Sequence, residues 1–432
     1  MPQALIESLD QDGQGVCHAD GKVVFVEGAL PGERVEYEVY RAKPRHARAR
    51  VTRVIEASAQ RVIPRCRHFG VCGGCSMQHF DASAQVAAKQ RVLEDALAHL
   101  GGVTAAVVHA PIAGRPWRYR ERARLTVRKV DSKGGVLIGF HQRRSSHVAD
   151  MAACDVLPAH ISDMVPALRA LVTALSIADR LPQIELASGD RATALVFRVL
   201  RPPSAADEVL FRQFARRQAV QVWLQPGPPA SAYPLEPADA PLLGHAVPEF
   251  GLRLEFRPTD FVQVNESVNR LLIRRAMRLL EPQPGERIAD LFCGFGNFSL
   301  PMARCGAYVV GIEGNEALVE RARHNARANG LDRQAEFHAA DLFESTPDSL
   351  AALGGLDKLL IDPPREGAIA VVKAIGPGAP RRIVYVSCNP ATLARDAAVL
   401  VHEKGYRLRG AGIVNLFPQT SHVESIALFE RG

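Results

Sequence analysis

A cysteine stands directly after an apolar segment late in the chain. Residues 381–387, with the sequence RRIVYVS, are rich in β-branched side chains, and Cys388, Asn389 and Pro390 follow them. This pattern predicts a buried parallel strand that ends where a helix begins. Ligands of doubly wound sheets bind at that edge, where a helix N-terminus or nearby cations can lower the pKa of a thiol. Cys388 is therefore a candidate nucleophile, with a small buried hydrophobic side chain as the alternative.

A glycine-bearing loop earlier in the chain suits a nucleotide-type cofactor. The strand-like residues 287–291 lead to Gly294 and Gly296, where the backbone can approach a ligand closely. The next strand-like run ends in Glu313, where a carboxylate would accept hydrogen bonds from ribose hydroxyls. Ser299 stands in place of the third glycine of the dinucleotide-binding pattern. This departure favours S-adenosylmethionine, which carries no phosphate, over NAD.

Two more acids follow strand-like runs of the same region. Asp341 could meet the adenine of this cofactor, with an exposed loop acid as the equally weighted alternative. Asp362 opens the sequence DPPR at residues 362–365, whose prolines stiffen the loop and direct the carboxylate into a cleft. Because strands and helices alternate from about Pro284 onward, we expect an α/β domain whose site lies at the carboxyl edge of its sheet.

A second group of cysteines has the spacing of a metal-binding loop. Cys66, Cys72 and Cys75 form a C-x5-C-x2-C pattern with two adjacent glycines. Cys154 is the best candidate for a fourth ligand, because Cys17 lies in a predicted barrel and the remaining cysteines belong to another predicted domain. Zinc and an iron–sulfur cluster both stay open, since both accept four thiolates. A disulfide is the weaker alternative.

The first sixty residues predict a small β domain. Strand-like runs are separated by Gly, Asp and Pro clusters, and they lie at residues 4–8, 23–26, 34–40 and 48–55. Six lysines and arginines and no acid lie between residues 41 and 53. This stripe suits a phosphate backbone, and a solvated charged face is the alternative. The segment resembles a TRAM domain, an OB-like RNA-binding barrel.

Residues 61–260 predict a central α+β domain. A helical periodicity over residues 84–100 ends at two glycines. Residues 115–129 interleave basic and aromatic side chains around one acid, and a second basic group lies at residues 141–144, after a hairpin-like turn at Gly134-Gly135. These patterns fit a nucleic-acid groove, with a charged antiparallel sheet face as the alternative. The candidates for stacking on a base are Trp117 and Tyr119.

Length and charge set the outer limits. A chain of 432 residues predicts about two to four domains. The net charge of +7 indicates a polyanionic partner only weakly. The sequence has neither an apolar run long enough for a membrane span nor a secretory signal. We therefore expect a cytoplasmic monomer with no membrane partner.

Taken together, the motifs resemble those of the RNA uracil-C5 methyltransferase family. They are DLFCGFGNF at 290–298, DPPR at 362–365, SCNP at 387–390 and SHVE at 421–424. The resemblance covers nearly the whole chain and is greatest to the branch that modifies 23S ribosomal RNA. It implies an α/β, Rossmann-like domain that uses S-adenosylmethionine over residues 261–432, a TRAM barrel over 1–60 and a [4Fe-4S] cluster on the four cysteines of the central domain.

The resemblance also assigns roles in the reaction. The Cys388 thiolate adds to carbon 6 of uracil, which makes carbon 5 nucleophilic, and Glu424 later removes the carbon 5 proton. The target base has to leave its stack to reach Cys388. Taken alone, Glu424 is more typical of a charge at a sheet edge, and Asp362 could orient the uracil instead of the cofactor. The residues expected around the cofactor are Gln263, Phe292, Asn297, Glu313, Asp341 and Asp362.

Four other functions compete with this one. The same chemistry on transfer RNA or on another 23S site is the nearest alternative. A cytosine-C5 methyltransferase resembles a family with cysteine directly after the Asp-Pro-Pro motif, where this chain has Arg365. An amino-directed methyltransferase needs no thiol, so it would not depend on Cys388. A non-catalytic iron–sulfur RNA-binding protein would have no affinity for S-adenosylmethionine.

Overall fold

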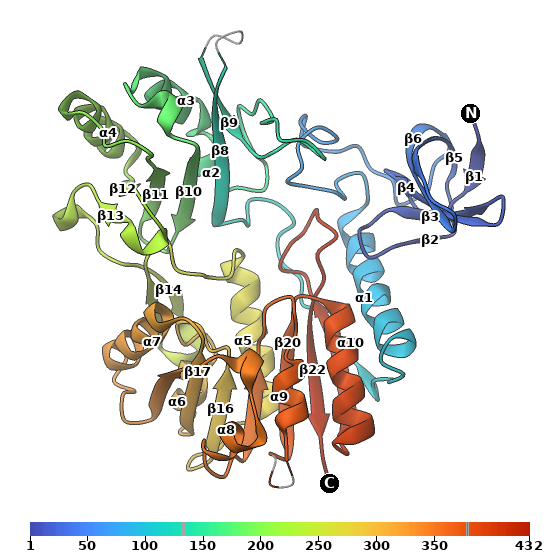
Figure 1. Cartoon of the computed structure of the whole chain (residues 1–432), viewed down its shortest axis with the longest axis vertical. Helices are drawn as coiled ribbons and strands as arrows, with labels where there is room; N and C mark the ends of the chain where they lie inside the picture. Colours follow the sequence, from blue (N-terminus) through green and yellow to red (C-terminus); the bar gives the residue numbers. More distant parts are fainter. Residues whose placement is uncertain (131–134, 377, 379) are drawn as a thin grey trace.

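The computed structural model describes residues 1–130, 135–376, 378 and 380–432 (Figure 1). A six-stranded sheet lies near the N-terminus, another in the middle of the chain, and an eight-stranded sheet in the C-terminal part. No helix within these ranges has the length and apolar character needed to cross a membrane.

The N-terminal sheet packs around a small core of its own. Its strands are β1 (Gln3–Leu5), β2 (Ser8–Leu9), β3 (Gly15–Ala19), β4 (Lys22–Glu27), β5 (Arg34–Ala42) and β6 (His46–Glu56), in the order β1-β5-β6-β4-β3-β2. Three predicted strands are confirmed, whereas the run at 4–8 is divided between β1 and β2. The structure adds β3. A Cβ on Gly15 would lie 2.8 Å from the Cβ of Ala29, so this glycine permits close packing within a strand.

The middle sheet is mostly antiparallel and has helices packed against it. Its strands are β8 (Arg122–Val130), β9 (Gly135–Gly139), β10 (Gln183–Ser188), β11 (Thr193–Arg198), β12 (Gln221–Gln225) and β13 (Tyr233–Pro234). The helices are α2 (Ala159–Ser162), α3 (Val165–Ala174) and α4 (Ala205–Gln218). Strands β8 and β9 form the predicted antiparallel pair. The first glycine of the turn predicted between them lies outside the described residues.

The C-terminal sheet alternates with helices, as the sequence predicts. Its strands are β16 (Arg287–Leu291), β17 (Tyr308–Glu313), β18 (Ala335–Ala339), β19 (Lys358–Ile361), β20 (Arg382–Ser387), β21 (Arg407–Val414) and β22 (Glu424–Glu430), with β7 (Val107–Val108) at one edge. The helices are α5 (Glu266–Leu280), α6 (Ser299–Arg304), α7 (Glu316–Ala328), α8 (Pro347–Ala351), α9 (Ile369–Ala374) and α10 (Pro390–Ala398).

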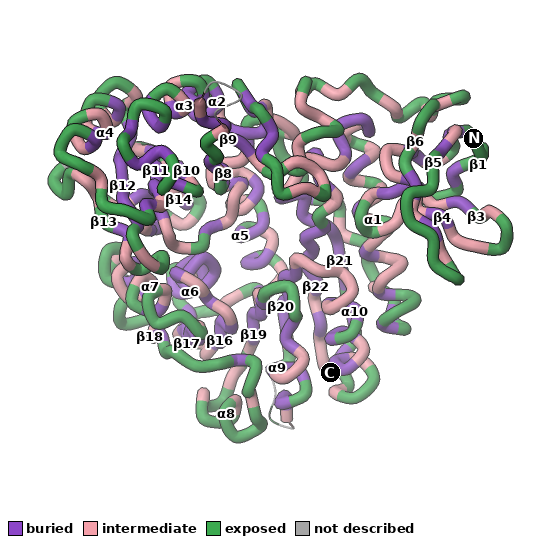
Figure 2. Tube along the Cα trace, turned by 45° about the horizontal axis from the view of Figure 1, so that its top comes forward, coloured by how far each residue is buried: buried purple, intermediate pink, exposed green. Residues whose placement is uncertain are grey.

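The order of this sheet is β18-β17-β16-β19-β20-β22-β21-β7. Strands β16 to β20 are parallel to one another, and β22 runs antiparallel between β20 and β21. The central strands are buried whereas α8 is exposed (Figure 2). The carboxyl ends of the parallel strands therefore share one edge, where doubly wound sheets bind their ligands.

Two segments from the range predicted for the central domain pack on the C-terminal sheet. Helix α1 (Ala82–His99) confirms the helix predicted at 84–100, and the Asp81 carboxylate caps it by accepting a hydrogen bond from the Ser83 amide at 2.9 Å. It packs against α10 and β21. Strand β7 pairs in parallel with β21. The domain limits of 61–260 and 261–432 stay a prediction.

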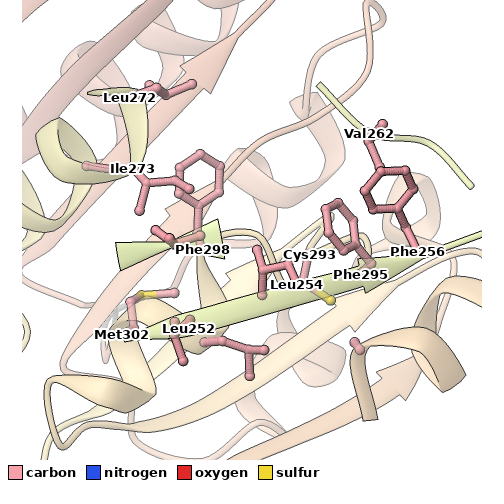
Figure 3. Packing of buried hydrophobic residues seen from close by; sticks show 14 of the residues in the cluster. Leu252, Leu254, Phe256, Val262, Leu272, Ile273, Cys293, Phe295, Phe298 and Met302 are labelled. Atoms are coloured by element: carbon pink, nitrogen blue, oxygen red, sulfur yellow. The ribbon is translucent and has the colours of Figure 1, made fainter. Parts of the chain in front are cut away.

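A two-stranded hairpin joins the middle and C-terminal parts. It consists of β14 (Leu243–Val247) and β15 (Leu252–Phe256). The Asn325 side chain of α7 accepts a hydrogen bond from the Glu255 amide at 2.8 Å. The apolar face of β15 meets the loop between β16 and α6 in one hydrophobic cluster (Figure 3). The hairpin thus packs against the buried side chains of the glycine-bearing loop.

Candidate active site

Strand pairing brings the predicted nucleophile and the predicted base to one edge of the sheet. Ser387, the last residue of β20, pairs with Ser425 of β22. The Ser425 hydroxyl donates a hydrogen bond to the Ser387 carbonyl at 3.2 Å. Cys388 and Glu424 are the next residues beyond this pair along their two segments. Both lie at the carboxyl edge of the parallel strands.

The loop that carries Cys388 is tied to the DPPR loop. Asn389 is the N-cap of α10, and its side-chain oxygen accepts a hydrogen bond from the Ala391 amide at 3.1 Å. Its side-chain NH2 group donates to the Arg365 carbonyl at 3.1 Å. The Thr392 hydroxyl donates to the same carbonyl at 3.3 Å. These contacts hold the loop of Asp362 beside Cys388.

Burial dominates the acid–base properties of this edge. The pKa of the Cys388 thiol is raised to about 12, mainly by burial and then by the carboxyl groups of Glu424 and Asp362, while Arg365 acts in the opposite direction. Burial also raises the pKa of Asp362 to about 7. The expected lowering of the pKa of Cys388 is wrong for the chain alone, because burial and two acids outweigh one guanidinium and a helix N-terminus.

The pKa of Glu424 is also raised, to about 8, by burial and then by Asp362. Arg365 and Lys89 act against this increase. Glu424 and the Cys388 thiol are therefore mostly protonated at pH 7, whereas Asp362 is close to half ionised. A positive charge bound beside them would favour their ionised forms.

The glycine-bearing loop adopts the left-handed backbone that its sequence predicts. Gly294 and Gly296 have φ angles of +55° and +96°. Phe292, a non-glycine residue, also has a positive φ of +64°, a conformation that costs about 1–3 kcal/mol and is concentrated at functional sites. The Gly294 amide donates a hydrogen bond to the Glu313 carboxylate at 3.1 Å, and the Asn315 amide donates at 2.9 Å. Glu313, at the end of β17, thus holds the glycine-bearing loop that follows the neighbouring strand β16.

Ser299 has a specific partner at the position where dinucleotide-binding proteins have glycine. Its hydroxyl donates a hydrogen bond to the Asp290 carboxylate at 2.5 Å. Asp290 is fully buried, and burial raises its pKa to about 7. The serine therefore pairs with one oxygen of a buried acid beneath the loop, whereas the other oxygen, Oδ1, is buried without a hydrogen-bond partner. Sequence reasoning did not single out Asp290, although an acid within the apolar run 287–292 is a detectable signal.

The other residues expected around the cofactor lie on the loop itself, in the segment before α5 and after β18. The side-chain amides of Asn297 and Asn269 exchange two hydrogen bonds, at 2.9 and 3.1 Å, and so connect the loop to α5. Asp341 is exposed and accepts a hydrogen bond from the Phe343 amide at 2.8 Å. The rings of Phe292 and Phe343 have centroids 5.7 Å apart. Gln263 lies half-buried in the segment before α5.

The four cysteines singled out in the sequence line one cavity. They are Cys66, Cys72, Cys75 and Cys154. Burial raises the pKa of Cys75 to about 12 and of Cys154 to about 11, and the neighbouring cysteines contribute to both increases. All eight cysteines are free thiols. In the described part of the chain no group of three or more His, Cys, Asp or Glu side chains is arranged to hold a metal ion.

A cleft of about 660 Å³ opens beside the active-site edge. It lies between the barrel, the cysteine loop, the hairpin after β9 and the segment before β22. Its basic and aromatic lining residues are Arg120, Phe140, His141, Arg143, Arg144, Phe417 and His422. Arg143 and Arg144 form ion pairs with Glu27 of the barrel at 2.8 and 3.2 Å. Part of the second basic group therefore holds the barrel in place.

One expectation about base stacking is wrong. Tyr119 is 5% exposed, and its hydroxyl donates a hydrogen bond to the Pro418 carbonyl at 2.8 Å. Its ring is therefore unavailable to a base, because it packs into the core and supports the segment before β22. Trp117 is half-buried under the Arg65 guanidinium, which lies 5.5 Å from its ring centroid.

Comparisons with known proteins identify the family of the chain. A family model described as tRNA (Uracil-5-)-methyltransferase matches residues 247–432, and a TRAM domain model matches residues 3–52. A protein of Aromatoleum aromaticum named "23S rRNA (uracil(1939)-C(5))-methyltransferase RlmD" is 69% identical over 432 residues, covering 100% of both chains. A protein of the same name from Dechloromonas aromatica is 57% identical and also covers 100% of both chains.

A solved structure is similar over almost the whole chain. It is the tRNA (uracil-54, C5)-methyltransferase of Pyrococcus abyssi in complex with S-adenosyl-L-homocysteine. The TM-score is 0.77, the sequence identity is 25%, and the alignment covers 99% of each chain.

Proposed function

The chain belongs to the RNA uracil-C5 methyltransferase family, and from this we propose that it transfers a methyl group from S-adenosylmethionine to carbon 5 of a uridine in 23S ribosomal RNA. The observation that carries the proposal is the placement of Cys388 and Glu424 beyond one strand pair, at the edge that also presents Asp362. The names of the relatives indicate uridine 1939 as the target.

The reaction needs a thiol and a base at one place. Carbon 5 of uracil is a poor nucleophile, so the Cys388 thiolate first adds to carbon 6 and gives an enolate. Carbon 5 then takes the methyl group as its bond to the sulfonium sulfur breaks, which would leave neutral S-adenosylhomocysteine. Glu424 removes the proton that remains on carbon 5, and the electron pair of that bond expels the thiolate from carbon 6. The product is 5-methyluridine with Cys388 regenerated.

S-adenosylmethionine would supply the methyl group and a positively charged sulfonium. We propose that Gln263, Phe292, Asn297, Glu313, Asp341 and Asp362 hold it at the glycine-bearing loop. Cys388 and Glu424 both have raised pKa values in the chain alone. A sulfonium bound beside them would favour the Cys388 thiolate and the Glu424 carboxylate, which are the forms that react.

The RNA has two basic surfaces to contact. The cleft is lined by His422, two residues before Glu424, and contains Arg120 and His141. The stripe at residues 41–53 lies on β5 and β6 of the barrel. We propose that the RNA backbone follows these surfaces while the target base is held against Cys388. We propose that the protein acts on RNA as a monomer in the cytoplasm.

The test is nucleoside mass spectrometry of unmodified 23S RNA after incubation with S-adenosylmethionine and protein purified without oxygen. We expect new 5-methyluridine. A second reaction with unmodified transfer RNA addresses the substrate of the P. abyssi relative, and methylation of transfer RNA alone would favour that alternative. 5-Methylcytidine or a methylated amino group would contradict the assignment of Cys388 and Glu424.

We also propose that Cys66, Cys72, Cys75 and Cys154 hold a [4Fe-4S] cluster. Their shared cavity supports a site that binds thiolates to a cationic centre. The resemblance to the family supports iron over zinc.

Replacing Cys154 with serine is expected to lower the iron content of anaerobically purified protein from about four atoms per chain to a small fraction of that. Elemental analysis and the visible absorption of the cluster are the measurements. Cys305→Ser is the control, because this half-buried thiol has its pKa raised by burial alone, with no cysteine neighbour. Zinc in the unchanged protein, or equal iron in Cys154→Ser, would contradict the cluster.

A further inference from the structure

Helix α1 buries two polar side chains on its apolar face. Gln85, Lys89, Leu93 and Leu97 follow one another every four residues and form one buried stripe. Gln85 is 1% exposed and Lys89 is 2% exposed. A buried ammonium group costs free energy unless hydrogen bonds and opposite charge compensate it, and lysine is rarely buried without them. The reaction described above gives Lys89 no role.

Lys89 is bound to the segment that carries the proposed base. Its ammonium donates hydrogen bonds to the Asn415 side-chain oxygen at 2.8 Å and to the Phe417 carbonyl at 2.9 Å. Both acceptors belong to residues 415–423, which connect β21 to Glu424 at the start of β22. In Figure 1 this connection rises above β22, toward α1. Lys89 therefore holds the first residues of the segment that leads from β21 to Glu424.

Other groups hold the same segment without adding charge. The Gln85 side chain accepts a hydrogen bond from the Gln419 amide at 3.0 Å and donates to the Gln419 side chain at 3.1 Å. The amides of Ser76 and Met77 donate to the Gln419 carbonyl at 2.9 and 3.0 Å. Lys89 differs from these groups because it also brings a positive charge.

That charge acts on Glu424. The charged groups that affect Glu424 are Asp362 and Arg365 from the loop after β19 and Lys89 from α1, and Glu424 in turn affects Cys388 after β20. His422, two residues before Glu424, has its pKa lowered to about 4 by burial and then by Arg365, so it is neutral near pH 7. Burial lowers the pKa of Lys89 to about 7, and Glu424 opposes this decrease. Each of the two groups thus favours the charged form of the other.

We propose that Lys89 is a positioning residue of the methyl-transfer reaction, which holds the segment bearing Glu424 and stabilises the carboxylate form of this base. The inference rests on the proposed role of Glu424. It adds to that role a specific source of positive charge, located on a helix far from the reacting atoms in sequence.

The test compares pH profiles of the turnover rate. Glu424 must lose its proton to act, so activity rises with pH through the pKa of this group. Lys89→Gln removes the charge and keeps a hydrogen-bond donor. Because Lys89 opposes the increase in the pKa of Glu424, we expect the midpoint of this rise to move to higher pH, so that the rate near pH 7 falls. The KM for S-adenosylmethionine is expected to stay unchanged.

Two variants separate charge from structure. Lys89→Arg keeps the charge and is expected to keep the midpoint of the unchanged protein. Gln85→Leu loosens the same segment without a change of charge, so it is expected to lower thermal stability and leave the midpoint in place. If Lys89→Gln does not fold, Lys89→Met, which fills the same volume, replaces it.

The outcomes distinguish this inference from the function on which it rests. Failure of the unchanged protein to form 5-methyluridine in any RNA contradicts the proposed function. If the unchanged protein is active and the midpoint of Lys89→Gln equals its midpoint, the inference on Lys89 is wrong while the function stands. An equal shift in Gln85→Leu would also overturn it, because the effect would then come from loosening the segment.

Discussion

Replacing Cys388 with alanine is expected to abolish methyl transfer while S-adenosylmethionine still binds. Without the thiol no group activates carbon 5, so we expect the rate to fall by at least about four orders of magnitude. The proposed cofactor contacts lie at the end of β17, after β16, β18 and β19, and before α5, and none of them is the Cys388 sulfur. Nucleoside mass spectrometry measures the product, and calorimetric titration measures cofactor binding.

The control for this variant is Cys305→Ala. Cys305 is a half-buried thiol just after α6, outside the group of residues assigned to the reaction. It is expected to keep the rate of the unchanged protein. Methylation by Cys388→Ala at a normal rate would exclude the thiolate mechanism and favour an amino-directed methyltransferase. Loss of both cofactor binding and activity would indicate that Cys388 supports the structure of the cofactor pocket.

Replacing Glu424 with glutamine is expected to stop the reaction at a later stage. The thiol can still add to carbon 6 and carbon 5 can still take the methyl group, but the carbon 5 proton is no longer removed. We expect turnover to fall by about 100- to 10,000-fold and a covalent RNA–protein adduct to accumulate. Denaturing gel electrophoresis detects the adduct, and the double variant Cys388→Ala with Glu424→Gln is expected to lack it.

The same variant has an expected effect on stability. The pKa of Glu424 in the folded chain is about 8, above its ordinary value of 4.5, so the unfolded chain loses this proton first as the pH rises. Glu424 therefore destabilises the fold increasingly between these two values. Glutamine cannot ionise, and Glu424→Gln is expected to melt at a higher temperature than the unchanged protein at pH 9. Glu430→Gln, at the other end of β22, is the control and is expected to show no such gain.

The periodicity of the sequence was sufficient for most of the C-terminal fold. Strands at 287–291 and 381–387 were predictable because apolar β-branched runs end in glycine, cysteine or acid, where a loop must begin. Their pairing was not. The insertion of β22 between β20 and β21 and the addition of β7 at the far edge do not follow from the local sequence pattern. Both depend on which strand edges are left unpaired once the other strands have assembled.

The site was predictable where function requires a particular residue type. Cys388 and Glu424 were named from motifs, and strand pairing places them together. Lys89 was missed because a lysine in a helix is normally on the solvated face. Its spacing with Leu93 and Leu97 was the available signal. The direction of the pKa of Cys388 was predicted wrongly, since burial by distant segments cannot be read from neighbouring residues.

The order of the large sheet also determines when the site can form during synthesis. Strand β22 leaves the ribosome after β20 and β21, yet it lies between them. Lys89 is 326 positions from Asn415, its hydrogen-bond partner. Helix α1 is thus synthesised early. The partners of its buried Gln85 and Lys89 side chains, in residues 415–423, are synthesised more than 300 residues later. A nascent chain that ends before β22 has Cys388 and the glycine-bearing loop but lacks Glu424, the proposed base.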